Sequence, residues 1–131
     1  MSSATERIQR YLEEELEDCR SEDVDQRLDE LDALETVLSP DRVETELDIL
    51  GALSNETRYK LVRFLVAADG ELCVCELNAL VAASESAISH ALADLHEAGL
   101  VTRRKEGRWR MYSATNLAVA LLTMLDGAVH E

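Results

Sequence analysis

The sequence has few of the residues that crosslink or stiffen a small secreted domain. Its 131 residues include three Cys, one Pro and five Gly, and only 4% are aromatic. Three cysteines are too few for a disulfide framework, so we expect free thiols, as in a cytoplasmic protein. With so few aromatic rings, the core must be built from aliphatic side chains, which the 47% hydrophobic content can supply.

Long apolar runs and catalytic motifs are also missing. No stretch approaches the roughly 20 apolar residues that a membrane-spanning helix needs. Residues 1–6 are polar and do not resemble a signal peptide. We therefore expect a cytoplasmic protein that does not associate with a membrane. The sequence has no glycine-rich phosphate loop and no evident nucleophile–base pair among its Cys, Ser and three His, so we do not expect an enzyme.

Lysine is nearly absent, and acidic residues dominate. The chain has two Lys and 11 Arg, and its net charge is −14. Residues 1–50 hold 17 acidic residues and five Arg, whereas residues 51–131 hold ten acidic and eight basic residues. An acid-rich, lysine-poor surface suits a protein that stays hydrated in strong salt, so the composition favours a halophilic source. An acidic tail on an ordinary mesophilic protein is the alternative.

Residues 1–39 read as an acidic helical extension. Apolar residues at helical spacing predict amphipathic helices over residues 4–19 and 23–38, with Cys19 on the apolar stripe of the first. The short link between them favours a helical hairpin. A charged extension that orders only against a partner is the alternative. The residues of the second helix expected to face inward are Val24, Leu28, Leu31, Leu34 and Leu38.

Residues 40–131 read as a second domain, mainly α-helical with a two-stranded β wing. Ser39-Pro40-Asp41 predicts a helix start, because a hydroxyl N-cap is followed by Pro in the first turn. Four helices should run from Pro40 to about Leu53, from Asn55 to Asp69, from about Glu76 to Val81 or Ala83, and from Ser84 to Ala98. Strands should follow over residues 100–104 and 109–113. This order is typical of a winged helix-turn-helix.

A last helix, over residues 117–129, is apolar nearly all round. A terminal helix on a small domain cannot bury all of those faces within one chain. We expect it to bury the remainder against a second copy, forming a homodimer.

The helix-turn-helix and its wing predict binding to double-stranded DNA. The first residues of the second helix would enter the major groove, where hydroxyls bond phosphates or base edges. The wing carries the only basic cluster in the sequence and would contact phosphates or the minor groove; a solvated charged hairpin is the alternative. The predicted DNA-binding residues are Ser84, Ser86, Ser89 and His90 in the helix, and Arg103, Arg104, Lys105, Arg108 and Arg110 in the wing.

The segment from Leu47 to Ser113 resembles the ArsR/SmtB family of metalloregulatory repressors. Three stretches carry the resemblance: Leu50-Gly-Ala-Leu-Ser-Asn-Glu-Thr-Arg58, Glu71-Leu-Cys-Val-Cys-Glu-Leu77 and Ser86-Ala-Ile-Ser-His-Ala-Leu92. The resemblance implies a homodimeric winged-helix repressor that leaves operator DNA when an inducer binds, with its first and last helices forming the dimer. It also implies that Thr57 and Arg58 support contacts with the DNA backbone. Together with the charge pattern, it favours a haloarchaeal source.

Two positions depart from the family pattern in the second helix. Position 91, often a second His, is Ala, and position 94, often basic, is Asp. This helix is therefore less basic than is usual in the family. The predicted helices of residues 4–38 also extend beyond the common family core.

The pair Cys73 and Cys75 resembles the arsenite-sensing motif of the arsenic repressors in this family. The resemblance implies As(III) or a soft metal ion as inducer and no obligatory cofactor. Thiolates are soft ligands, which suits such an ion. The third Cys of the family motif is replaced here by Asn78, so Cys19 would have to complete a three-sulfur site. Residues two apart in a regular helix point to different sides, so both thiols would reach one ion only if the helix start distorted.

Three interpretations of the thiol pair remain open. The cysteines bind arsenite or a soft metal, they sense oxidants together with Cys19, or they are small buried residues of a regulator with another input. A different class of function is also open, in which the acidic helices bind a protein partner and the winged helix serves as a docking module.

Overall fold

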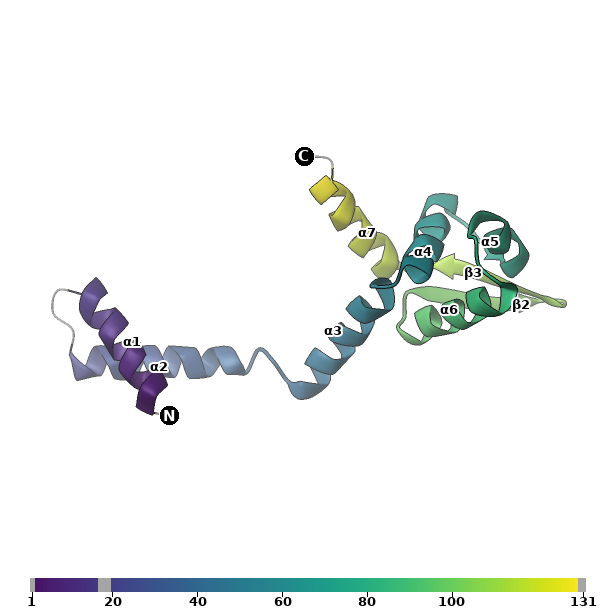
Figure 1. Ribbon diagram of the computed structural model, residues 1–131. Coiled ribbons are helices and arrows are strands. Elements are labelled where there is room, and N and C mark those ends of the chain that lie inside the picture. The colour runs from purple at the N-terminus through teal and green to yellow at the C-terminus, as the bar shows by residue number, and fades with distance from the viewer. Residues whose placement is uncertain (1, 17–19, 130–131) are drawn as a thin grey trace. The chain divides into compact units, whose positions relative to one another are not determined.

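The computed structural model describes residues 2–16 and 20–129 (Figure 1). By its internal contacts the chain divides into two compact units, Met1–Val43 and Glu44–Glu131. This boundary lies near residue 39, where the sequence predicts the first domain to end. The division into domains 1–39 and 40–131 stays a prediction.

Two helices form most of the first unit. Helix α1 (Ser2–Glu15) packs against α2 (Ser21–Glu35), and Val24 is the buried residue of α2. Both helices end earlier than predicted. Leu34 and Leu38 are 61% and 62% exposed, so the prediction that they face inward is wrong. Leu38 lies beyond the end of α2, where the helical spacing no longer applies.

Helices α3 (Pro40–Leu53) and α4 (Glu56–Ala68) begin at the predicted caps. Ser39 Oγ accepts the backbone N–H three residues on at 3.2 Å, and Asn55 Oδ1 does the same for α4 at 3.0 Å. Each cap satisfies an N–H that has no partner within the helix. Helix α4 is capped at its C-terminal end by Asp69, which takes the left-handed conformation with φ of 49°. The predicted stop at this position is confirmed.

The winged helix-turn-helix predicted from the sequence is present in the second unit. Its two helices are α5 (Val74–Leu80) and α6 (Glu85–Glu97), and its wing strands are β2 (Val101–Glu106) and β3 (Trp109–Ala114). The sheet has a third strand, β1 (Leu72–Cys73), and the order β1–β3–β2 with antiparallel pairing. The predicted wing had only two strands, because two residues are too short to show the alternation that marks a strand.

The β2–β3 hairpin extends past the helices that pack against its base (Figure 1). Gly107 sits in its turn with φ of 61°, a conformation that glycine adopts without strain. At the base of the sheet, Tyr112 of β3 is paired with Leu72 of β1 and is only 3% exposed. The buried end of the hairpin thus fixes the wing, while its tip projects into solvent.

The core of the second unit is almost wholly aliphatic, as the composition predicts. Helices α4, α5, α6 and α7 and the base of the sheet all contribute to it. Its largest fully buried side chains are Leu61, Leu65, Leu77, Ile88, Leu92, Leu95, Leu100 and Leu122.

The last helix, α7 (Asn116–Val129), buries only part of its apolar surface. Ala118 and Leu122 are fully buried against the core. Large apolar side chains on α7 remain exposed: Leu117, Val119, Met124, Leu125 and Val129. Within the described ranges, no helix combines the length and the hydropathy needed to cross a bilayer.

Candidate nucleic-acid interface and thiol pair

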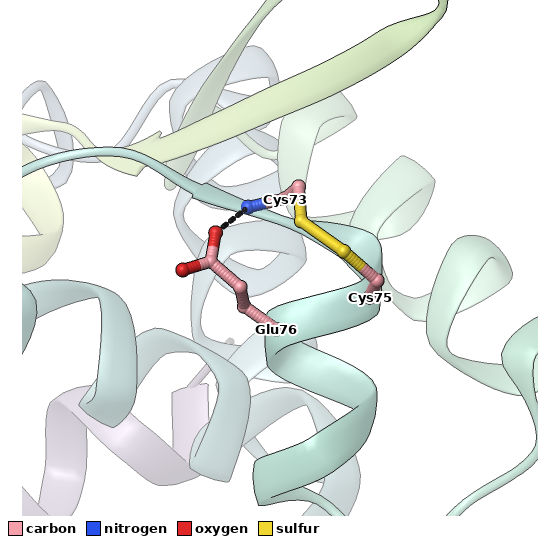
Figure 2. Close-up of a disulfide and its surroundings, with 3 residues drawn as sticks. All are labelled: Cys73, Cys75 and Glu76. Carbon is pink, nitrogen blue, oxygen red and sulfur yellow. Dashed lines mark hydrogen bonds between the residues drawn. A yellow bond between two sulfur atoms is a disulfide. The ribbon is translucent and has the colours of Figure 1, made fainter.

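Cys73 and Cys75 lie at the junction between the sheet and the helix-turn-helix. Cys73 ends β1 and is the N-cap of α5, with φ of −85° and ψ of 168°, and Cys75 lies in the first turn of α5. Their Cα atoms are 5.4 Å apart and their sulfur atoms are joined in a disulfide (Figure 2). Cys73 is 8% exposed, whereas Cys75 is exposed.

This geometry corrects two expectations from the sequence. The expectation of free thiols is wrong for this pair in the structure. The expectation that the helix start must distort before both sulfurs can meet is also wrong. Cys73 has extended backbone and stands outside the helix, so its side chain turns toward Cys75 without any irregularity in α5.

Glu76 fixes the backbone of the thiol segment. Its Oε1 accepts the N–H of Cys73 at 2.9 Å, reaching back from the third position of α5 to the N-cap (Figure 2). A carboxylate in this place satisfies an N–H that the helix leaves without a partner and complements the positive end of the helix. The start of α5 is thereby held firmly against the end of β1.

The described residues do not complete a three-ligand site around the thiol pair. Asn78, at the family's third-cysteine position, is half-buried in α5. No group of three or more His, Cys, Asp or Glu side chains within residues 2–16 and 20–129 is placed to hold a metal ion. Cys19, the predicted third sulfur, lies outside the described residues.

Helix α6 presents a polar face opposite its buried one. Ile88, Leu92 and Leu95 are fully buried, and the predicted contact residues Ser86, Ser89 and His90 are exposed. Ser84 is the N-cap, and its Oγ accepts the N–H of Ala87 at 3.0 Å. The structure therefore brings these polar residues together at the N-terminal part of α6.

Arg58 is held within the protein. Its Nε donates to the carbonyl oxygen of Ala52 at 2.7 Å and one Nη donates to Gly51 at 3.3 Å, which caps the last turn of α3. Its other Nη lies 3.6 Å from Asp94 of α6. The contact with Arg58 offsets the negative charge of Asp94, the residue that makes α6 less basic than is usual in the family. Beside them, a cleft of about 300 Å³ is lined in part by Thr57 and His90.

The wing carries four exposed basic side chains that have no carboxylate partner in the described part of the chain: Arg103, Lys105, Arg108 and Arg110. The guanidinium of Arg108 stacks over the ring of Trp109, 5.1 Å from its centroid. Trp109 is 49% exposed near the turn of the hairpin. The wing thus offers a row of cations and one planar side chain to solvent.

Arg104 differs from the other wing bases because it is bonded to two carboxylates. Its Nε and one Nη donate to the two carboxylate oxygens of Glu71, each at 2.6 Å, and the same Nη donates to Glu106 at 2.9 Å. The hydrogen bonds from Glu71 first, and from Glu106 second, raise the pKa of Arg104. The sequence did not predict that Glu71 bonds to Arg104, because the two residues are far apart in the chain and only the sheet brings them together.

A winged helix-turn-helix with an exposed polar face on α6 and a basic wing defines a DNA-binding transcription regulator rather than an enzyme. The chain also matches the family model described as "Bacterial regulatory protein, arsR family" over residues 55–103. It is 52% identical over 126 residues to the "Putative arsenical resistance operon repressor ArsR" of Halobacterium salinarum, covering 96% of this chain and 98% of that one. The chain therefore belongs to the arsR family of transcription regulators.

Two further comparisons agree with this assignment. The chain is 51% identical over 86 residues to the "Putative arsenical resistance operon repressor ArsR2" of Halobacterium salinarum, covering 66% of this chain and 72% of that one. It also resembles the "Crystal structure of Possible transcriptional regulator for arsenical resistance" with a TM-score of 0.52 and 43% identity. That match covers 63% of this chain and 83% of the other. The predicted family, fold and regulatory class are confirmed, and the Halobacterium relatives fit a halophilic source.

Proposed function

We propose that this chain is a homodimeric repressor that leaves its operator DNA when arsenite, or another thiophilic metal ion, binds Cys73 and Cys75. One observation carries the proposal. The two sulfur atoms converge where β1 ends and α5, the first helix of the helix-turn-helix, begins. The arsenical-resistance repressors among the relatives, one of them matching nearly the full chain, support arsenite as the inducer.

The chemistry of the pair suits trivalent arsenic. Arsenite is As(OH)₃ near neutral pH, and the two reduced cysteines would each replace one hydroxyl group. The products are a (Cys73-S)(Cys75-S)As–OH unit and two molecules of water. Soft thiolate sulfur is a favoured ligand for such an ion. The disulfide in the structure supports this reaction, since it places both sulfurs within reach of one atom.

A third ligand would replace the last hydroxyl group. Asn78 cannot supply a sulfur, so Cys19, from the same or the partner subunit, is the proposed donor. Without Cys19, the two sulfurs and the retained hydroxyl still give arsenic three ligands.

DNA binding is proposed for the exposed polar residues of α6 and for the wing. Ser86, Ser89 and His90 would lie in the major groove, next to the Ser84 cap that begins α6. The wing bases Arg103, Lys105, Arg108 and Arg110 would contact phosphates or the minor groove. Thr57 lines the cleft beside His90 and would support a backbone contact. Arg58 would act by holding α3 and Asp94 in place, given its bonds to Gly51 and Ala52.

The dimer is proposed to form through residues 117–129 and the N-terminal helices. The exposed residues Leu117, Met124 and Leu125 follow the helical spacing of one face of α7, which gives that face an apolar surface. Leu117 and Leu121 line an apolar cleft of about 230 Å³ with Ile49 and Leu50 of α3. A second copy would cover this surface, as symmetric association joins the same patch on two chains. We also propose that the regulator acts in the cytoplasm, where its DNA would lie.

The test is the affinity for DNA from the promoter of its own gene, measured by fluorescence anisotropy in strong salt. Reduced wild-type protein should bind, and arsenite should weaken binding by roughly 5–150-fold, the usual range of allosteric coupling. The variant Cys73→Ser with Cys75→Ser should bind equally well and ignore arsenite. If the double variant still leaves DNA when arsenite is added, the proposal fails. Cys19→Ser is the matched control, because it tests the third ligand alone.

Oxidant sensing is a second candidate function, favoured by the Cys73–Cys75 disulfide itself. The thiolate of the exposed Cys75 would attack hydrogen peroxide, breaking its O–O bond and giving a sulfenic acid and hydroxide, which takes a proton from solvent to become water. The thiol of Cys73 would then attack that sulfur, forming the disulfide and releasing a second water. Release of DNA by peroxide, but not by arsenite under reducing conditions, would favour this function over the first.

A further inference from the structure

We propose that Arg104 is a coupling residue: with Glu71 it links the Cys73–Cys75 segment to the wing, so that a change at the thiols alters the wing's position on DNA. This inference rests on the proposed switch at Cys73 and Cys75. It gives Arg104 a role that differs from the phosphate contact predicted from the sequence.

The sheet register places the thiol segment and Arg104 in one row. Cys73 of β1 is paired with Met111 of β3, and Met111 is paired with Arg104 of β2. Directly paired residues in an antiparallel sheet point to the same face. Glu71 lies just before β1, and its two hydrogen bonds with Arg104 place its carboxylate on that face. One face of the sheet therefore carries a continuous path from Cys73 to the wing.

The Glu71–Arg104 contact closes this path across β3. Two hydrogen bonds of 2.6 Å hold the guanidinium and the carboxylate edge to edge. Such paired, charge-assisted bonds fix direction as well as distance. Strand β1 itself is only two residues long, so its ladder to β3 is short. The bidentate contact thus adds a direct restraint between the thiol segment and β2, beside the short pairing of β1 with β3.

The bonding of Arg104 also argues against a phosphate contact. Glu71 and Glu106 already engage both its Nε and one of its Nη atoms. A phosphate would have to approach a guanidinium flanked by two carboxylates, both of which repel it. The neighbouring Arg103 and Lys105 are exposed and have no carboxylate partner within the ranges that the structure describes.

Reaction at the thiols would act on this path directly. Cys73 is both the last residue of β1 and one of the two sulfur donors. Two free thiols are not bonded to each other, whereas arsenic bonds both sulfurs, so arsenic binding would draw Cys73 and Cys75 together and move the backbone that Glu71 precedes. With the Glu71 contact intact, the displacement reaches Arg104 and the β2 strand of the wing. Without it, the displacement would be absorbed in the segment between Gly70 and Cys73.

The test compares Glu71→Gln and Arg104→Gln with two controls. Glu106→Gln removes the other carboxylate of Arg104 but leaves the link to the thiol segment. Arg103→Gln removes a neighbouring exposed base. Each variant is measured for the Kd of promoter DNA with and without arsenite, for the dependence of Kd on salt, for arsenic bound per chain by intact mass, and for thermal unfolding.

We expect Glu71→Gln and Arg104→Gln to bind both arsenic and DNA. In these variants the ratio of the Kd for promoter DNA with arsenite to the Kd without arsenite should fall toward one. Glu106→Gln should keep the wild-type ratio. Arg104→Gln should leave the salt slope unchanged, whereas Arg103→Gln should lower it by about one, the effect of losing one phosphate contact. The exchange Glu71→Arg with Arg104→Glu should restore part of the ratio if the contact itself matters.

Two results would overturn the inference. One is a wild-type Kd ratio in Glu71→Gln or Arg104→Gln, whatever the thermal stability of the variant, and the other is a salt slope lowered by Arg104→Gln as much as by Arg103→Gln. Failure of the proposed switch looks different, because wild-type protein would then not respond to arsenite, or Cys73→Ser with Cys75→Ser would respond normally.

Discussion

The guanidinium of Arg63 on α4 donates a hydrogen bond to the carboxylate of Asp126 on α7, with 2.8 Å between Nη1 and Oδ1. The Nε of Arg63 also donates to the hydroxyl of Tyr59 at 2.7 Å. These bonds, that of Tyr59 first, raise the pKa of Arg63. The bond to Asp126 ties the apolar last helix to α4.

Asp126→Asn should therefore weaken the anchoring of α7 and leave the response to metal ions unchanged. Because Arg63 and Asp126 are 30% and 54% exposed, the expected loss of stability is below about 1 kcal/mol. Thermal unfolding of Asp126→Asn, Arg63→Met and the double variant measures the coupling energy between them. A change in arsenite-dependent DNA release in Asp126→Asn would contradict this purely structural role.

Ser84 and Ser86 should separate stability from DNA binding. Ser84 caps α6 through its bond to Ala87, so Ser84→Ala should cost about 1 kcal/mol of folding free energy. Ser86 is exposed and its side chain makes no hydrogen bond within the described residues, so Ser86→Ala should leave stability unchanged and weaken DNA binding. Urea unfolding and anisotropy on both variants provide the check. Equal effects of the two changes on DNA affinity, after correction for stability, would contradict this division.

The exposed apolar surface of α7 should hold the dimer together. Met124 is 77% exposed, so Met124→Glu should leave the monomer folded while placing a charge in the proposed interface, where it would be desolvated without a partner. Thr123→Glu is the matched control, one residue along on the face turned away from Leu117 and Leu121. Sedimentation velocity should show monomers for the first variant and dimers for the second. Dimers in both would place the interface elsewhere.

Arsenite and oxidant should exclude each other at the thiol pair. A disulfide leaves no thiolate to displace hydroxide from arsenic, so peroxide-treated protein should bind no arsenic until a reductant is added. Intact-mass measurement on reduced, oxidised and re-reduced protein tests this order. Arsenic bound by the fully oxidised chain would place its site away from Cys73 and Cys75.

Much of the fold follows from sequence patterns that act locally. The caps at Ser39, Asn55 and Ser84 and the spacing of the buried leucines predict the helices of the second unit, because these signals depend on neighbours within one or two turns. Strand β1 was missed since two residues carry no pattern. Leu34 shows the opposite error, in which an apolar residue at the right spacing has no core to face.

The candidate site was less predictable, because its key relationships join distant parts of the chain. The sequence places Arg58 and Arg104 among the DNA-binding bases, and nothing local indicates that Arg58 bonds to the end of α3 or that Arg104 bonds to Glu71. The sequence likewise did not predict that the sulfur atoms of Cys73 and Cys75 meet. A helical reading separates them, whereas the strand-to-helix junction at Cys73 brings them together.

Native mass spectrometry of the protein bound to promoter DNA, titrated with arsenite under reducing conditions, tests the central claim most directly. It reports the number of chains, DNA duplexes and arsenic atoms in each species at once. The account predicts a DNA-bound dimer without arsenic and, as arsenite is added, a free dimer with one arsenic per chain, with neither change in Cys73→Ser with Cys75→Ser. A fully arsenic-loaded dimer that stays on DNA, or wild-type protein that takes up no arsenic, would contradict it.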